Sequence, residues 1–387
     1  MHRRTVARWR SLGGAALAAV VLAACSATPS TTSTTSSPSA TLSAALRALV
    51  ATPGGPPGAI ALVDVGGHPQ VLTAGVGNVA TGRVIDSNDT TRLASVAKAF
   101  NGAVALALVS HGKLSLTDTI GKWLPSLPAW ASVTLAQLLQ HTGGVPDYIK
   151  NPQFLSALQA DPQAVMTPAQ LLGFVAAEPL EFPPGSRYKY SDSDNIVVGL
   201  MIEAATGTSY ESALATYVTA PLQLTKTNLP VNAQMPDPYV HGYAVEAGKA
   251  PVDDSSSLNP GLAWASGGMN STIAELNTFM RAYVGGKLFD AATQQQQLQL
   301  IPGDSGPPGP GTNSAGLAVF RYQTSCGTVY GHSGNYPGYT AFSVSNRQGT
   351  RSAVVVVNEQ INSGTTTTAF TQLRHVWELG VCAALQG

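Results

Sequence analysis

A serine and a lysine three positions apart are the residues of this chain best placed to do covalent chemistry. Ser95 and Lys98 open an apolar stretch, rich in Ala, Val and Leu, whose spacing predicts a helix as far as Val109. Side chains three positions apart share one face of a helix, so the lysine amine would lie beside the serine hydroxyl. A neutral serine is a weak nucleophile until a neighbouring base takes its proton. The pair therefore predicts a serine nucleophile that is assisted by a lysine.

The same Ser-x-x-Lys spacing occurs twice more, at Ser110 with Lys113 and at Ser186 with Lys189. The first of these pairs lies where the helical pattern stops, and the second follows a Pro-Pro-Gly turn. Neither context supplies the helix that would align the two side chains. We therefore assign the chemistry to Ser95.

Two further residues would complete a site around Ser95. Tyr190 precedes an apolar helix, and a lysine ammonium nearby would lower the pKa of its phenol. It would then act as general base to Ser95 and as general acid to the leaving group. His332, at the end of a predicted strand, would position a substrate carboxylate or tune Tyr190. Taken singly, each is more often an ordinary structural residue, a half-buried tyrosine beside a turn and a polar histidine at a strand end.

The elements that must hold these residues are strands at both ends of the chain and helices between them. Strands are predicted at residues 59–65, 70–77, 316–322, 326–331, 339–345 and 351–358, and terminal helices at 42–50 and 367–385. Helix starts of the capping-box type are predicted at Thr134, Thr167, Thr208 and Thr272. This order implies an α+β fold in which an antiparallel sheet of N- and C-terminal segments is flanked by helices and carries an inserted, mainly helical region. A cleft between the two parts is the expected place for a site.

The composition describes a globular chain of 387 residues, 44% hydrophobic and 11% charged, with enough apolar material for a sizeable core. The formal net charge is zero, but four arginines lie among the first ten residues. Without them the charge is about −4, which argues against nucleic acid as a partner because such a partner requires a basic face.

The start of the chain predicts export. Residues 1–24 have the basic, then apolar, pattern of a signal peptide, and Leu-Ala-Ala-Cys ends at Cys25. This ending resembles the bacterial lipobox, which implies lipidation of Cys25 and anchoring at the outer face of the cytoplasmic membrane. An ordinary signal peptide with a chance cysteine is the alternative. Residues 25–44, rich in Ser, Thr and Pro, predict a flexible tether, and residues 45–387 the globular domain.

Two cysteines remain in this domain, Cys326 and Cys382. They form either a disulfide, which an exported protein permits, or two buried free thiols. The seven histidines lie far apart and show no metal-ligand spacing, so we expect neither a metal nor another cofactor.

The ordered motifs around Ser95, Tyr190 and His332, separated by 95 and 142 positions, resemble those of the serine β-lactamase and penicillin-binding protein superfamily. The similar branch contains class C β-lactamases, D-alanyl-D-alanine carboxypeptidases of the Streptomyces type and related esterases. Residues 112–118 (GKLSLTD), 134–144 (TLAQLLQHTGG) and 265–269 (ASGGM) are also similar to that branch. The resemblance thus covers about residues 46–385 and implies the β-lactamase/transpeptidase-like fold.

The resemblance also implies roles for individual residues. Ser95 would be the acylated nucleophile, Lys98 would assist its deprotonation, and Tyr190 would be base and acid. Backbone N–H groups of Ser95 and Asn335 would form the oxyanion hole, beside Gly334. The implied activity is that of an exported serine hydrolase that acts on an ester, an amide or a peptidoglycan stem peptide.

Two positions depart from the family pattern. Asp192 stands where the family usually has an asparagine, so an amide-recognising side chain is replaced by one that offers only acceptors and can form a salt bridge to Lys98. His332 stands where β-lactamases carry a lysine, which resembles carboxypeptidases and some esterases. His332 thus argues against efficient antibiotic hydrolysis, although a β-lactamase is still one alternative. A wall-binding lipoprotein whose chemistry Asp192 has impaired is another.

Overall fold

The computed structural model describes residues 37–364 and 367–387. The predicted signal peptide, the predicted lipidation residue Cys25 and most of the predicted tether lie outside these residues. The helices are α1 (Pro38–Val50), α2 (Ala97–Ser110), α3 (Ile120–Trp123), α4 (Leu135–Leu139), α5 (Pro152–Ala160), α6 (Pro168–Gly173), α7 (Asp192–Thr206), α8 (Tyr210–Leu214), α9 (Trp264–Gly267), α10 (Ile273–Val284), α11 (Ala291–Gln297) and α12 (Thr367–Gln386). Short 3₁₀ or π turns are η1 (Ala94–Val96), η2 (Pro128–Trp130), η3 (Tyr148–Lys150), η4 (Ala215–Thr219) and η5 (Pro260–Leu262).

An antiparallel sheet of eight strands joins the two ends of the chain, in the order β2-β1-β12-β11-β10-β9-β8-β7. The strands are β1 (Gly58–Val65), β2 (His68–Gly75), β7 (Ile301–Pro302), β8 (Thr312–Ala315), β9 (Phe320–Thr324), β10 (Gly327–Tyr336), β11 (Tyr339–Ser345) and β12 (Arg351–Val357). Two small sheets pair β3 (Thr90–Arg92) with β6 (Asn270–Thr272) and β4 (Tyr243–Ala244) with β5 (Val252–Asp253). The predicted α+β architecture is confirmed.

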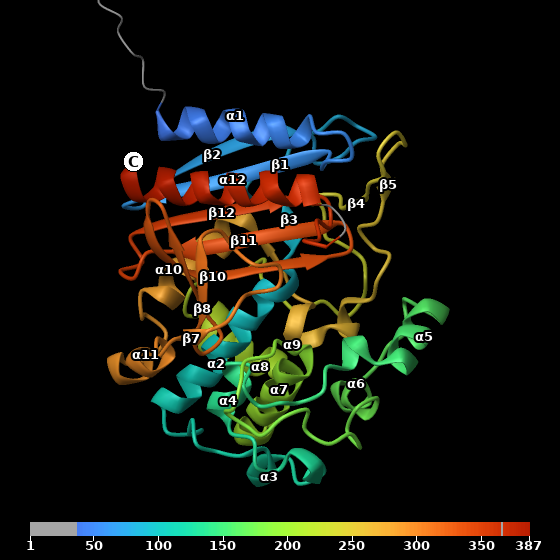
Figure 1. The fold of residues 1–387 in the computed structure, drawn as a ribbon, viewed down its shortest axis with the longest axis vertical. Helices are drawn as coiled ribbons and strands as arrows, with labels where there is room; N and C mark the ends of the chain where they lie inside the picture. The colour runs from blue at the N-terminus through green and yellow to red at the C-terminus, as the bar shows by residue number, and fades with distance from the viewer. Residues whose placement is uncertain (1–36, 365–366) are drawn as a thin grey trace, which may run out of the picture. The chain divides into compact units, whose positions relative to one another are not determined.

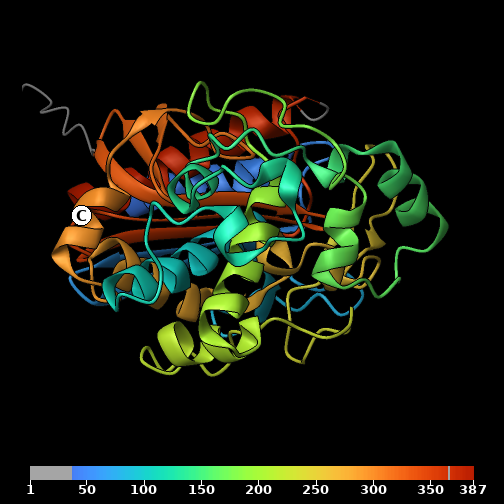
Figure 2. The ribbon, with the colours of Figure 1, turned by 90° about the horizontal axis from the view of Figure 1, so that it is seen from below.

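Helices cover both faces of the sheet (Figures 1 and 2). Side chains alternate across a strand, and on β1 Ala59 belongs to the cluster formed with α1 and α12, whereas Ile60 belongs to the cluster formed with α2 and α10. The inserted region, residues 97–297, supplies most of the helices of the second cluster, as predicted (Figure 1). The sheet therefore separates two apolar layers, and the site lies on the α2 side.

Helix α1 begins earlier than the sequence predicts. The sequence predicts a tether over residues 25–44 and a helix from residue 42, whereas α1 starts at Pro38. Ser37 caps it by accepting the N–H of Ala40, and proline at the first helical position suits the fixed φ of that residue. Leu42 and Leu46 are buried against α12, which fixes the helix to the domain.

The strands around the predicted 316–322 segment also differ from expectation. This segment was predicted as one strand, but β8 ends at Ala315 and β9 begins at Phe320. Ala318 between them has a φ of 51°, in the left-handed region that breaks a strand. The apolar run thus forms a tight connection, and its strand character begins only at Phe320.

A disulfide joins Cys326, in the turn between β9 and β10, to Cys382 in α12, with 5.1 Å between the Cα atoms. Of the two alternatives for these cysteines, the structure contains the disulfide. It closes a loop across 56 positions, which stabilises the fold by about 2–4 kcal/mol by restricting the unfolded chain. None of the helices among the described residues is both long enough and apolar enough to cross a bilayer.

Candidate active site

Ser95 lies in η1, directly before α2, with Lys98 in the first turn of that helix. Its predecessor Ala94 has a φ of 51°, a strained conformation of the kind found at functional sites. The Nζ atom of Lys98 donates to the Oγ atom of Ser95 over 3.0 Å. The structure thus brings the predicted pair together.

The other two Ser-x-x-Lys matches lie elsewhere. The Ser110 hydroxyl accepts the N–H of Asp290, and Lys189 pairs with Glu181. Neither serine is among the described residues that line the cavity beside Ser95. Of the three serines, Ser95 is therefore the one that lines this cavity.

Lys98 is fully buried and makes three polar contacts. Besides Ser95, it donates to Asp192 Oδ1 over 2.5 Å and to the carbonyl oxygen of Ser266 over 2.8 Å. Three acceptors match the three N–H bonds of an ammonium group. The salt bridge between Lys98 and Asp192 that the sequence suggested is present.

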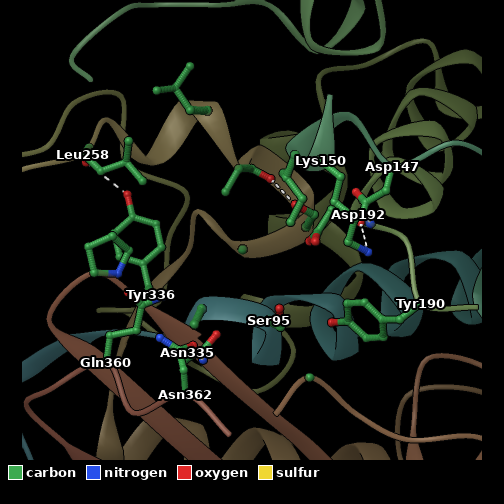
Figure 3. Close-up of a pocket in the computed structure, with 18 of the residues that line it drawn as sticks. Ser95, Asp147, Lys150, Tyr190, Asp192, Leu258, Asn335, Tyr336, Gln360 and Asn362 are labelled. Atoms are coloured by element: carbon green, nitrogen blue, oxygen red, sulfur yellow. Dashed lines mark hydrogen bonds and ion pairs between the residues drawn. The ribbon is translucent and has the colours of Figure 1, made fainter. Parts of the chain in front are cut away.

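Tyr190 faces Ser95 across the cavity, and its hydroxyl points toward the serine (Figure 3). That hydroxyl is buried and makes no hydrogen bond within the part of the chain that the structure describes. The Nζ atom of Lys98 lies 4.9 Å from the centre of the tyrosine ring. The tyrosine is therefore placed to exchange a proton with either group once a substrate closes the remaining gap.

The predicted lowering of the Tyr190 pKa by Lys98 is wrong. Burial, and then the negative charge of Asp192, raise the pKa of the Tyr190 phenol well above its usual value, and the Ser95 hydroxyl only partly opposes this. The physical reason is that the phenol is buried and that Asp192, which pairs with Lys98, offsets the positive charge of the lysine. The phenol is thus neutral in the resting site.

His141 holds Tyr190 in place, a role that the sequence did not reveal. Its ring stacks on the ring of Tyr190 with 4.4 Å between the centres, and its carbonyl oxygen accepts the N–H of Lys189 over 2.9 Å. Its Nδ1 atom lies 2.9 Å from Asp194 Oδ2, with both side chains buried. Burial, and then the charge of Lys98, lower the pKa of His141 well below its usual value, so this support is uncharged. His141 lies within residues 134–144, whose similarity to the family was the one indication in the sequence that this residue contributes to the site.

Strand β10 forms the wall opposite the tyrosine. A Cβ atom at Gly334 would lie only 2.4 Å from the backbone nitrogen of Ser95, so glycine is needed for this close approach. Asn335 lines the cavity, and its Nδ2 atom donates to Asn362 over 2.6 Å. Pairing of β10 with β9 ends at Gly331, and beyond it Asn335 and Tyr336 line the cavity. Gly334 and Asn335 therefore adjoin Ser95 as the motif predicted.

His332 is not among the described residues that line the cavity, so direct contact with a substrate carboxylate is not supported, and its influence on Tyr190 stays a prediction. The side chain is fully buried, next to Phe320 and 6.4 Å from Tyr190 between ring centres. His332 and Gly334 are two positions apart on β10 and therefore lie on the same face of the strand. At the position of His332, the rings of Tyr190 and Phe320 cover that face. Burial, and then the charge of Lys98, lower the pKa of His332 to about 3.

The neutral state of His332 makes a pH-dependent contribution to stability that can be measured. An unfolded histidine binds a proton near pH 6.5, but the folded protein binds it only near pH 3. This contribution is therefore complete above about pH 6.5 and is lost as the pH falls toward 3. The free energy of unfolding of the parent protein should fall as the pH is lowered from about 6 to 4. In His332→Gln this fall should be smaller by about 1.4 kcal/mol for each pH unit.

Urea unfolding of both proteins across this range measures the difference. His68→Gln, at an exposed position on β2, is the matched control. Equal slopes for the parent protein and for His332→Gln would show that His332 is not kept neutral by the fold.

The cavity beside Ser95 has a volume of about 530 Å³. Figure 3 shows Asp147, Asp192 and Lys150 together on one side, and Asn335, Tyr336, Gln360 and Asn362 on the other, with Ser95 between them. Tyr190 lies on the side of Asp192 (Figure 3). Of these, sequence reasoning missed Asp147, Lys150, Tyr336, Gln360 and Asn362. The remaining wall is largely apolar, with side chains from η3, α5 and the loop before η5. The site can hold a small amide or ester with an apolar substituent.

The charged groups of the cavity are mainly acidic. Asp147 accepts the backbone N–H of Asp192 over 3.1 Å, and Lys150 Nζ lies 2.9 Å from the other oxygen of Asp147. Burial, and then the charge of Asp192, raise the pKa of Asp147 to about 6. No cluster of three potential metal ligands occurs in residues 37–364 and 367–387.

Comparison with known proteins gives the following relatives. The model of a family described as Beta-lactamase matches residues 43–376. Penicillin-binding protein 4* of Bacillus subtilis (strain 168) is 25% identical over 276 residues, 68% of this chain and 59% of that protein. A beta-lactamase of Escherichia coli (strain K12) is 28% identical over 248 residues, 63% of this chain and 61% of that protein. The chain thus spans about three fifths of the length of these curated relatives.

Compared with these curated relatives, the solved structures that resemble this chain are matched over more of their own length. A D-stereospecific amidohydrolase from Streptomyces sp. has 29% sequence identity and a TM-score of 0.75, covering 86% of this chain and 97% of its own. A D-amino acid amidase from Ochrobactrum anthropi SV3 has a TM-score of 0.76 at 20% identity, covering 88% and 98%, and shows a shared fold.

Proposed function

Because the chain belongs to the Beta-lactamase family, we propose that it is a serine hydrolase that cleaves an amide or ester through an acyl-enzyme on Ser95. The observation that carries the proposal is the 3.0 Å hydrogen bond between Lys98 and Ser95 at the wall of an open cavity. A nucleophile beside a basic group, with a second proton-carrying residue facing it, is the arrangement that acyl transfer requires. The intact pair and cavity also favour this function over a catalytically impaired wall-binding protein.

The reaction would proceed in two steps. The Lys98–Tyr190 pair first releases one of its protons to solvent, which leaves one of the two groups as a base. The Oγ atom of Ser95 then bonds to the substrate carbonyl carbon, and its proton passes to that base. The same proton goes to the leaving amine or alcohol as the bond to the carbonyl carbon breaks. Water then attacks the acyl-enzyme, which releases a carboxylic acid and returns a proton to Ser95. Backbone N–H groups of Ser95 and Asn335 would hold the oxyanion in both steps.

The charges of the site favour substrates without a carboxylate near the scissile bond. Lys150 is the sole cationic side chain among the described residues of the cavity wall, and it pairs with Asp147. His332, which stands where β-lactamases carry a lysine, is buried and neutral. A C-terminal D-alanine or a penicillin would bring its carboxylate into a cavity whose described wall carries two carboxylates and no unpaired cation, which is unfavourable. Amide and uncharged ester hydrolysis is therefore favoured over carboxypeptidase or β-lactamase activity.

A matched pair of peptides tests this preference. One peptide ends in D-Ala-D-Ala with a free carboxylate, and the other has the same sequence with a C-terminal amide. We expect kcat/KM for the amidated form to be at least about tenfold higher, the effect of one unfavourable charge contact. A chromogenic cephalosporin and a neutral p-nitrophenyl ester extend the comparison. Faster cleavage of the free acid, or efficient cephalosporin turnover, would contradict the preference and support a carboxypeptidase or a β-lactamase.

We also propose that the protein acts outside the cytoplasm, anchored through a lipid at Cys25. The Cys326–Cys382 disulfide supports export, because such bonds persist mainly in oxidising compartments. The signal-like residues 1–24 and the Leu-Ala-Ala-Cys sequence support the anchor.

A further inference from the structure

We propose that Asp147 forms a subsite for a positively charged amine of the substrate, beside the carbonyl that Ser95 attacks. This inference rests on the proposed function and names its substrate class, which is an amide or ester whose acyl part carries a free amine. Three observations support it: Asp147 is buried, its Oδ2 atom has no hydrogen bond of regular geometry among the described residues, and the exposed Lys150 lies against that atom.

Asp147 is a buried carboxylate that faces the cavity. Only 6% of the residue is exposed, and it lies among the residues that line the space next to Ser95. Its Oδ1 atom accepts the backbone N–H of Asp192, but its Oδ2 atom has no hydrogen bond within the described residues. The partner of this oxygen is the ammonium of Lys150, 2.9 Å away, so a ligand that binds here must supply a cation in its place.

Lys150 occupies the position that the amine would take. Its Nζ atom lies 2.9 Å from Asp147 Oδ2 but outside hydrogen-bonding geometry, and 60% of its side chain is exposed. Only the lysine end of this ion pair is exposed, and its departure alone would leave Asp147 buried without a charge partner. The lysine can therefore move into solvent when another cation takes its place. A substrate ammonium in its place conserves the charge of the site and adds the missing hydrogen bond. An anion would meet two carboxylates and is excluded by the same charges.

The position of Asp147 relative to the reacting atoms fits an amine close to the scissile bond. A chain of direct contacts leads from Ser95 to Lys98, from Lys98 to Asp192, and from Asp192 to Asp147. Figure 3 shows Asp147 and Asp192 together on the side of the cavity that faces Ser95.

An apolar wall adjoins the acidic subsite. Ile149 and Leu155 line the cavity and are partly exposed, and Phe154 beside them is buried. An acyl part with an amine and an apolar side chain would therefore satisfy both surfaces. Amides of apolar amino acids have this shape.

Phenylalaninamide, in each of its two enantiomers, and 3-phenylpropionamide, which lacks only the amine, are suitable probes. Ammonia release is measured at about pH 7, where the α-ammonium is mostly protonated. We expect wild-type kcat/KM for one phenylalaninamide enantiomer to exceed that for 3-phenylpropionamide at least about tenfold, since an unpaired buried acceptor disfavours the analogue. Asp147→Asn should lower this ratio about tenfold, because the amide keeps the bond to Asp192 and loses the charge.

Two control variants separate the subsite from general effects of charge. Lys150→Ala removes the competing cation and should raise the ratio. Asp161→Asn makes the same chemical change at an exposed position outside the cavity and should leave the ratio at the wild-type value. Because each ratio compares two substrates on one protein, partial unfolding of a variant does not alter it. If Asp147→Asn does not fold, a wild-type ratio of about ten or more that increases in Lys150→Ala supports the subsite. A wild-type ratio close to one, or no increase in Lys150→Ala, overturns it.

Labelling of Ser95 by a fluorophosphonate distinguishes failure of this inference from failure of the proposed function. If Ser95 is labelled but the wild-type ratio is close to one, or Asp147→Asn matches Asp161→Asn, the amine subsite is overturned and the serine hydrolase stands. If Ser95 is not labelled and no probe is cleaved, both proposals are overturned.

Discussion

Replacement of Ser95 with alanine should abolish covalent labelling by a fluorophosphonate and lower hydrolysis of any accepted amide or ester by about a thousandfold or more. The expected loss is large because the substitution removes the atom that forms the acyl bond, leaving only binding and oxyanion stabilisation. Intact-protein mass spectrometry of the labelled protein, followed by peptide mapping to Ser95, measures the first effect. Initial rates measure the second.

The other Ser-x-x-Lys pairs supply matched controls for this experiment. Ser110→Ala and Ser186→Ala make the same chemical change, at positions outside the described cavity wall. Both should label and hydrolyse like the parent protein. Labelling that persists in Ser95→Ala, or that disappears in Ser186→Ala, would contradict the assignment of the nucleophile.

Replacement of Lys98 with methionine should lower both activity and stability. Acylation should fall by about a hundredfold or more, the usual contribution of a group that transfers the nucleophile's proton. The free energy of unfolding should fall by about 3 kcal/mol, because Asp192, whose side chain is only 13% exposed, loses its ionic partner. Fluorophosphonate labelling rates and urea unfolding measure the two effects separately.

The double variant Lys98→Met with Asp192→Asn separates chemistry from folding. Removing both charges leaves no unpaired carboxylate, so most of the lost stability should return. The labelling rate should stay as low as in Lys98→Met, since the proton carrier is still absent. If activity returned together with stability, Lys98 would be a structural residue rather than part of the reaction.

The sequence predicted the fold well because the hydrophobic periodicity and the helix-capping residues indicated the same elements. The capping boxes at Thr134 and Thr167 are present with both reciprocal hydrogen bonds, and Thr272 caps α10. At Thr208 the prediction was wrong by one residue, because Ser209 caps α8 instead. Neighbouring Thr and Ser side chains offer the same acceptor, so the pattern alone cannot choose between them.

The site was predictable where local spacing determines geometry. Ser95 and Lys98 share a helical turn, and their contact follows from that turn alone. Asp147 and Gln360 reach the cavity only through the packing of the insert against the sheet, for which no spacing rule exists. The pKa of Tyr190 was predicted in the wrong direction because its value depends on burial and on Asp192 as well as on Lys98.

The order of strands in the sheet determines at what stage of synthesis and folding the site can form. β1 pairs with β12, and Ala59 lies opposite Val357, about 300 positions later. Joining such distant segments is entropically costly and makes folding slow. Strand β10, which supports the backbone of Ser95 through Gly334, belongs to the same late-forming sheet. A partly synthesised or partly translocated chain therefore carries Ser95 and Lys98 without the wall that makes them a site, so nearly the whole chain must be present before catalysis can begin.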